Sequence, residues 1–180
     1  MISMQPVVIE RASASLGCWD ELTVGQRFTL GSTRITLSAS LEFSRTFDPF
    51  SFHVDPEAAK ESMFGSLIVS GLHTLSAVHA LSIRGGFLVE PSVLCGAGID
   101  EIRFLRPVCP DDTISVVAEV IDLKPPHPGR DFGIARAKYW VTNDRGVIVM
   151  TFIDNHVIKL RRAGLFSRRE GQPVPPGANE

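Results

Sequence analysis

An acid and a histidine lie close together in the stretch from Phe43 to Thr74, FSRTFDPFSFHVDPEAAKESMFGSLIVSGLHT. Asp48 and His53 are five residues apart, and an ideal helix would place them roughly 140° apart around its axis. Pro49 biases Asp48 away from helical torsions and cannot extend a helix that begins upstream. We therefore predict that the pair lies on a loop, where both side chains can turn toward one point. A carboxylate and an imidazole placed in this way can hold a water molecule and perform general acid–base catalysis.

A glycine at the start of a helix is the third group that could take part in chemistry. Ser70 is a favourable N-cap residue, so the sequence predicts a helix that begins at Gly71. The first N–H groups of a helix lack an intrahelical acceptor, and negative charge is favoured there. The Gly71 N–H could therefore polarise a thioester carbonyl and stabilise an enolate-like oxygen. Acid, base and oxyanion donor together predict a hydratase or dehydratase that acts on a conjugated carbonyl.

Each of these residues also has a simpler interpretation. Asp48 before Pro49 can make a turn or a cap, and an isolated His53 would most simply be a core histidine with a hydrogen-bond partner. Ser70 and Gly71 can be a helix cap and nothing more. The occurrence of all three groups in one segment, ahead of an apolar helix, favours the functional interpretation.

The composition narrows the class of protein. The chain has 180 residues, of which 44% are hydrophobic and 21% charged, and a net charge of -2, which indicates one soluble globular domain. The absence of a basic excess argues against nucleic acid as a partner. No apolar run approaches the roughly 20 residues of a membrane span, and the N-terminus lacks a signal-peptide pattern. Three scattered cysteines indicate free thiols in a reducing compartment. We expect a cytoplasmic protein with no membrane partner.

Other kinds of site have weaker support in the sequence. No His, Cys and Asp set has the spacing of metal ligands, and no glycine-rich phosphate loop is present, so we expect neither a metal nor a cofactor. His79 is better suited to packing or an interface than to chemistry. Four arginines near the C-terminus predict a solvated tail or, as an alternative, contacts to the phosphates of a ligand: Arg161, Arg162, Arg168 and Arg169.

Helices dominate the first half of the predicted fold. Arg27–Leu37 alternates as a strand or as a hairpin centred on Gly31. Ser38–Thr46 has helical spacing with Ser38 or Ser40 as the cap. Asp55 caps a short helix that runs to about residue 62, and the broad apolar face of Gly71–Arg84 predicts a largely buried helix.

The second half of the chain predicts an antiparallel sheet. Its four expected strands are Val93–Phe104, Thr113–Leu123, Phe132–Thr142 and Val147–Leu160. One apolar face of this sheet needs a cover, and the Gly71–Arg84 helix is the candidate. We therefore predict an α+β hot-dog fold, an antiparallel sheet wrapped around one central helix, with sheet edges that favour a homodimer. We expect an irregular arm over residues 1–17, a single domain over 18–160 and a flexible tail over 161–180.

The segment Asp48–His53, DPFSFH, resembles a loop of the MaoC-like dehydratases and R-specific enoyl-CoA hydratases. Their loop reads Asp-x-Asn-Pro-Leu-His or Asp-Pro-Gln-Pro-Phe-His. The resemblance runs from about residue 20 to 160, and the similar segments are Val54–Ala59, Phe64–Gly65, Ser70–Thr74 and Ile102–Val108.

The resemblance implies a hot-dog enzyme of fatty acid metabolism that hydrates a 2-enoyl thioester reversibly. Asp48 and His53 would activate or remove water, with the Gly71 N–H as oxyanion donor. The substrate would be an acyl-CoA or an acyl carrier protein thioester, held in a tunnel of a homodimer. We assign substrate contacts to five neighbouring residues: Phe50, Phe52, Ser70, Leu72 and His73.

Two residues depart from the family loop and leave alternatives open. Phe50 replaces an amide that could orient the catalytic groups, and Ser51 replaces a proline. The site is then supported elsewhere, or it suits an unusual substrate, or its catalysis is weakened. One alternative function is a hot-dog thioesterase, although such enzymes usually carry an acid on or near the central helix and Gly71–Arg84 has none. The other is a non-catalytic subunit that binds acyl thioesters.

Overall fold

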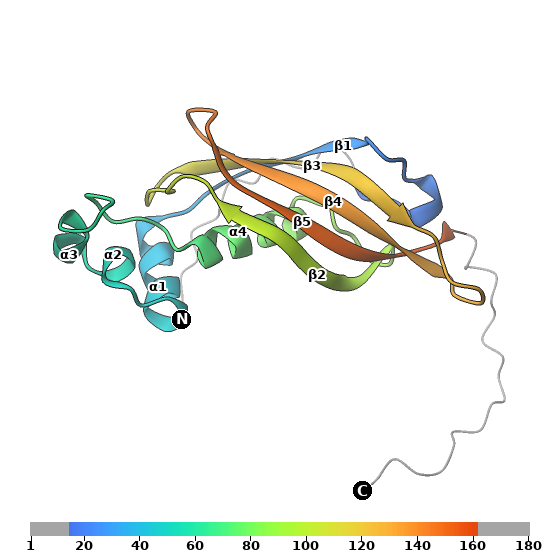
Figure 1. Cartoon of the computed structure of the whole chain (residues 1–180), viewed down its shortest axis with the longest axis horizontal. Coiled ribbons are helices and arrows are strands. Elements are labelled where there is room, and N and C mark those ends of the chain that lie inside the picture. The colour runs from blue at the N-terminus through green and yellow to red at the C-terminus, as the bar shows by residue number, and fades with distance from the viewer. Residues whose placement is uncertain (1–14, 162–180) are drawn as a thin grey trace, which may run out of the picture.

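A single sheet of five antiparallel strands, in the order β1-β3-β4-β5-β2, forms the larger layer of the computed structural model, which describes residues 15–161. The strands are β1 (Arg27–Arg34), β2 (Val93–Phe104), β3 (Thr113–Lys124), β4 (Phe132–Asn143) and β5 (Ile148–Lys159). The helical segments are η1 (Trp19–Glu21), α1 (Leu37–Phe47), α2 (Ser51–Val54), α3 (Pro56–Lys60) and α4 (Gly71–Arg84). Figure 1 shows the sheet curving over α4, with α1, α2 and α3 gathered at one end. The predicted hot-dog fold is confirmed.

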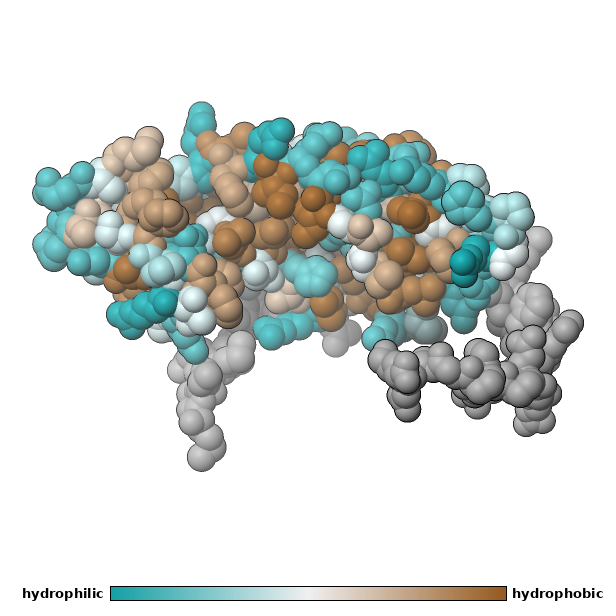
Figure 2. All heavy atoms as spheres, turned by 60° about the horizontal axis from the view of Figure 1, so that its bottom comes forward, coloured by the Kyte–Doolittle hydropathy of each residue, from teal (hydrophilic) through white to brown (hydrophobic). Residues whose placement is uncertain are grey.

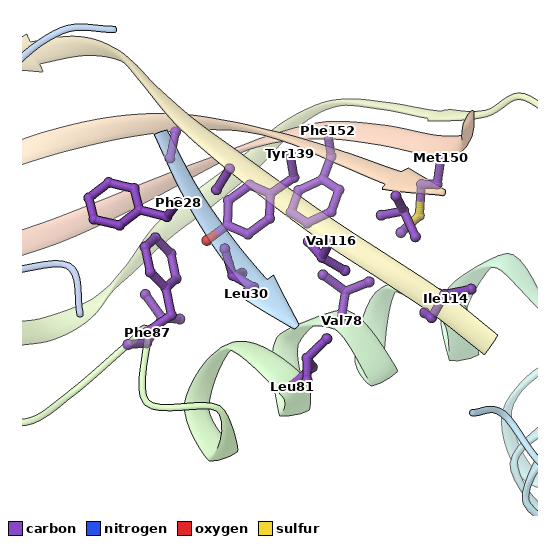
Figure 3. Close-up of a cluster of buried hydrophobic side chains, with 14 of the residues drawn as sticks. Phe28, Leu30, Val78, Leu81, Phe87, Ile114, Val116, Tyr139, Met150 and Phe152 are labelled. Carbon is purple, nitrogen blue, oxygen red and sulfur yellow. The ribbon is translucent and has the colours of Figure 1, made fainter. Parts of the chain in front are cut away.

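The core lies between the inner face of the sheet and α4. Buried and exposed residues alternate along β3 and β4, because successive strand residues point to opposite faces. The ring of Tyr139 stacks on that of Phe152 at 4.5 Å between centroids, and Val78 and Leu81 of α4 belong to the same cluster (Figure 3). Burial of an aliphatic side chain of this size contributes about 1.5–3 kcal/mol. Packing of one helix face on the sheet therefore holds α4 in place.

The helix α4 begins and ends where the sequence predicts, but it is not largely buried. Ser70 caps it and Gly85 follows its last residue. Val78 is buried, whereas Leu72 and Ile83 remain 49% and 52% exposed. The sheet covers only one side of the helix, and the opposite side lies open.

Of the two forms predicted for the first β segment, the single strand is confirmed. β1 has a bulge after Thr29, where Gly31 has a φ of 97°, and it forms no hairpin. The predicted cap of the following helix is wrong. The cap of α1 is Thr36, whose hydroxyl accepts from the Ala39 N–H at 3.3 Å. The helix already begins at residue 37, which places both predicted serine caps inside it.

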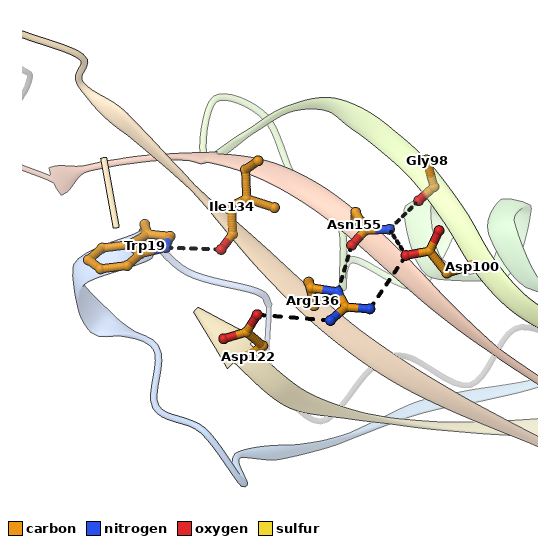
Figure 4. A network of polar contacts seen from close by, with 7 residues as sticks. All are labelled: Trp19, Gly98, Asp100, Asp122, Ile134, Arg136 and Asn155. Carbon is orange, nitrogen blue, oxygen red and sulfur yellow. Dashed lines mark hydrogen bonds and ion pairs between the residues drawn. The ribbon is translucent and has the colours of Figure 1, made fainter. Parts of the chain in front are cut away.

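Polar side chains hold the edge strand β2 to the sheet from its outer face (Figure 4). The pairing of β2 with β5 shifts register at three points, so its backbone ladder is interrupted. The amide of Asn155 donates to the Gly98 carbonyl and to Asp100 Oδ2, both at 3.0 Å, and accepts from Arg136 Nε at 3.1 Å. These bonds fix the irregular edge strand beside β5.

Residues near both ends of the described range contact the packed domain. Leu16, inside the expected arm, is fully buried, and its N–H donates to the Phe87 carbonyl at 2.8 Å. Trp19 Nε1 donates to the Ile134 carbonyl at 3.3 Å (Figure 4). At the other end, the Arg161 N–H donates to Asp20 Oδ1 at 2.8 Å.

The rest of the predicted arm and tail, with Arg162, Arg168 and Arg169, lies outside the described residues. Within residues 15–161, no helix is both long enough and apolar enough to cross a membrane.

Candidate active site

Asp48 lies in the short connection between two helices, whereas His53 lies in the second of them. α1 ends at Phe47, and the N–H of its C-cap residue Asp48 donates to the Ser44 carbonyl at 2.9 Å. The chain then forms the single turn α2, and the His53 N–H donates to the Phe50 carbonyl at 2.8 Å. The loop prediction is therefore wrong for His53, because the residues after Pro49 have room for one helical turn.

The two side chains nevertheless meet. Asp48 Oδ2 lies 3.4 Å from His53 Nε2, and the imidazole is buried. His53 Nδ1 lies 2.9 Å from the Ile68 carbonyl oxygen; since a carbonyl can only accept, Nδ1 carries the proton. In the neutral ring, Nε2 then presents a lone pair toward Asp48. At 3.4 Å the pair lies beyond the usual range of an N–H···O bond, and both atoms can accept hydrogen bonds from one water molecule.

Ser70 fixes the carboxylate in this position. Its hydroxyl donates to Asp48 Oδ2 at 2.6 Å and accepts from the N–H groups of Leu72 and His73 at 3.1 and 3.4 Å. Ser70 is fully buried. The structure therefore places the Ser70 hydroxyl between Asp48 and the start of α4, where it holds the carboxylate.

Gly71 and His53 line one cavity of about 310 Å³. Among the described residues, none accepts a hydrogen bond from the Gly71 N–H, as expected for the first residue of a helix. The Phe104 ring lies against Gly71, and a Cβ at this position would be 2.6 Å from Phe104 Cε1. The close approach of this ring requires glycine here.

The aromatic residues of the family-like segment divide between the cavity and the surface. Phe52 lines the cavity, whereas Phe50 is outside its lining, is 62% exposed and stacks on Phe52 at 5.3 Å between centroids. Asp48 accepts its hydrogen bond from Ser70, and His53 donates to the Ile68 carbonyl, so neither bond involves residue 50. Phe50, in place of the family's amide, therefore leaves the orientation of the pair intact.

Leu72 and His73 also lie outside the cavity. His73 is two residues beyond Gly71, about 200° around the helix, and stacks on Phe43 of α1 at 4.7 Å between centroids. Burial lowers the pKa of His73 from its ordinary value. The structure therefore places Leu72 and His73 outside the lining of this cavity, and their contact with a substrate stays a prediction.

Most of the residues that line the cavity were missed by the sequence reasoning, among them Thr74, Phe104 and Met150. Thr74 lies three residues after Gly71, on the same side of the helix, so its spacing was an available signal. Phe104 and Met150 come from β2 and β5 and are brought together by strand pairing. No local pattern indicates that pairing.

The comparisons with known proteins identify a family model and a curated relative that match this chain. The family model of the MaoC like domain matches residues 22–131. The protein YdeM of Bacillus subtilis is 35% identical over 106 residues, which are 59% of this chain and 74% of YdeM.

Two solved structures are similar over most of the chain. The MaoC-like dehydratase from Rhodospirillum rubrum has a TM-score of 0.74 at 31% identity, over 80% of this chain and 97% of that one. The (R)-hydratase from A. caviae involved in PHA biosynthesis has a TM-score of 0.58 at 25% identity, over 77% and 97%. The chain therefore belongs to the MaoC-like dehydratase family, which supports a hydratase or dehydratase activity in general terms.

Proposed function

We propose that this protein catalyses the reversible hydration of a 2-enoyl thioester, carried by coenzyme A or by an acyl carrier protein, to the 3-hydroxyacyl thioester. One observation carries the proposal. The Ile68 carbonyl fixes the tautomer of His53, whose free Nε2 lies 3.4 Å from Asp48 Oδ2 beside the cavity that Gly71 lines.

The pair can activate water directly. A water molecule that donates one hydrogen bond to Asp48 and one to His53 Nε2 presents its oxygen to C3 of the substrate. As the C3–O bond forms, Nε2 takes a proton from the water, and the π electrons move toward C2 and the thioester oxygen. The imidazolium then gives the proton to C2 and the carbonyl forms again, so one water has been added. Asp48 stabilises the transient imidazolium.

The Gly71 N–H supplies the third element of this mechanism. The thioester oxygen gains negative charge while C3 is attacked, and a fixed N–H at a helix N-terminus lowers the energy of that state. Phe52, Phe104 and Met150 give the cavity apolar walls, which favours a hydrocarbon chain next to the thioester.

We further infer that two copies pair through β2. This strand is at an edge of the sheet, and Leu94, Ile99 and Phe104 are large exposed apolar residues on it or at its end. An uncovered edge of 12 residues is a template for another strand. Antiparallel pairing with a second β2 would cover these residues and close the cavity from one side.

The hydration assay follows loss of the absorbance of the conjugated double bond in crotonyl-CoA. We expect activity in the wild type and a fall in kcat of about 10²- to 10⁴-fold in His53→Gln. His127→Gln is the matched control, because His127 is exposed in the loop between β3 and β4, and it should retain full activity. Full activity in His53→Gln refutes the mechanism. Release of free thiol without hydration would instead identify a thioesterase.

A further inference from the structure

A second cavity, of about 400 Å³, lies at the other end of α4 from Gly71. Its lining includes His79 and Ile83 of α4, Leu94 and Ile99 of β2, and Asp154 and His156 of β5. The two β5 residues point to the inner face of the sheet, because they are two apart on a strand and both are buried. The proposed hydration uses neither residue.

Asp154 is a buried carboxylate that has no hydrogen bond to any of residues 15–161. It is 5% exposed. His156 Nε2 lies 3.6 Å from Asp154 Oδ2, which is beyond hydrogen-bond range. A buried carboxylate without donors is costly, so a donor from a bound molecule would be strongly favoured at this place.

His156 does not neutralise Asp154. Its Nε2 lies 3.1 Å from Tyr139 Oη, within hydrogen-bond distance. Burial lowers the pKa of His156, with an opposing effect of Asp154 and a further lowering effect of His79, so the ring is uncharged at neutral pH. The cavity thus contains a buried carboxylate that accepts no hydrogen bond from any of residues 15–161.

One side of α4 leads from the proposed active site toward this cavity. Gly71, Leu75, His79 and Ile83 follow each other at intervals of four, so each lies close to the next on the helix surface, and the row turns by about 120° from the first to the last. A depression lined by Leu75, His79, Ile83 and Ile99 lies beside the second cavity, with which it shares His79, Ile83 and Ile99. Gly71 and His79 are separated by about 12 Å along the helix axis. Figure 2 shows hydrophobic side chains along the middle of the face that carries α4 and β2.

We propose that the second cavity binds the far end of the substrate's acyl chain and selects chains that carry an O–H or N–H donor there, with Asp154 as the acceptor. The inference rests on the proposed function for the identity of the ligand as an acyl thioester. The apolar side of α4 accommodates the methylene groups, and Asp154 receives the polar end.

Calorimetric titration with saturated thioesters tests this inference, because these ligands cannot be hydrated. Decanoyl-CoA, ω-hydroxydecanoyl-CoA and ω-aminodecanoyl-CoA have chains about as long as the separation of roughly 12 Å between Gly71 and His79 along the helix axis. We expect at least one of the two donor-bearing ligands to bind the wild type about tenfold more tightly than decanoyl-CoA, as expected for a hydrogen bond to a charged group. Comparison of the two donor-bearing ligands shows whether the cavity prefers a hydroxyl or an amine at the end of the chain.

Two variants at one position connect the preference to the carboxylate. Asp154→Leu removes the acceptor and should abolish the preference while keeping affinity for decanoyl-CoA. Asp154→Asn keeps the shape of the side chain and should reduce the preference for the donor-bearing ligands. This variant provides the test if Asp154→Leu does not fold. Asp144→Asn, in the exposed hairpin turn, should behave as the wild type.

The outcomes separate this inference from the proposed function. Equal affinity of the wild type for all three ligands, or no binding of any of them, overturns the inference, as does an unchanged preference in the Asp154 variants. Selective binding without hydration of crotonyl-CoA would leave the second cavity established and refute only the proposed reaction.

Discussion

Ser70 connects the cap of the central helix to the carboxylate of Asp48. One buried hydroxyl both accepts from N–H groups in the first turn of α4 and donates to Asp48. Under the proposed mechanism, stability and activity depend on the same oxygen atom.

Ser70→Ala should lower the free energy of unfolding by about 1–3 kcal/mol, because a helix cap and a hydrogen bond to a charged group are both lost. It should also lower kcat, since Asp48 would no longer be held toward His53. Urea unfolding and the hydration assay measure the two effects. Ser76→Ala, which removes an exposed hydroxyl bonded to Leu72 on the same helix, should change neither by much. An Ser70→Ala variant with wild-type kcat would show that Ser70 is only a cap.

At the scale of the elements, local signals in the sequence determine the ends of α4. Ser70 is a cap, Gly85 follows the last residue, and the apolar spacing between them fits a helix. Asp55 likewise caps α3, accepting from the N–H groups of Glu57 and Ala58. Such signals depend on residues within one turn, so a single sequence reveals them.

Contacts between distant elements could not be predicted in the same way. Phe104 against Gly71 depends on the register of β2 on β5 and on the side of α4 that stays open. Asp154 and His156 did carry a signal, since two polar residues share one face of an apolar strand. Their meeting with Tyr139 required the pairing of β4 with β5.

Two histidines, His73 of α4 and His156 of β5, make the free energy of unfolding depend on pH. Burial lowers the pKa of His73 and of His156 from the ordinary value of 6.5. Below pH 6.5 the unfolded chain then binds more protons than the folded one, so the free energy of unfolding falls with decreasing pH. The contribution of the two histidines to the free energy of unfolding is complete above pH 6.5. It is lost as the pH decreases through the pKa that each histidine has in the folded protein.

Urea unfolding between pH 7.5 and about pH 5, above the range where most carboxylates titrate, measures this effect. We expect a smaller loss of stability on acidification in the double variant His73→Phe, His156→Gln than in the wild type. His127→Gln, which removes an exposed imidazole, should leave the slope unchanged. Identical slopes in the wild type and the double variant would contradict the assignment to these two residues.

At the scale of the whole molecule, the open side of α4 and the edge strand β2 belong to one exposed apolar region. We expect the wild type to be a dimer in light scattering after gel filtration, and Ile99→Lys to be a monomer, because a charge on β2 opposes pairing of two edges. Val117→Lys places the same charge at an exposed apolar position of β3 and should remain a dimer. A monomeric wild type, or a dimeric Ile99→Lys, would contradict pairing through β2.

The central claim is that Asp48 and His53 act together on one water molecule. Groups that act as a unit lose activity in a non-additive way, so the double variant is more informative than either single one. The most direct test is kcat for hydration of crotonyl-CoA by Asp48→Asn, His53→Gln and the combination of both. We predict large losses in both single variants and no further loss of comparable size in the double variant. Losses that multiply in the double variant, or wild-type kcat in either single one, would contradict the account.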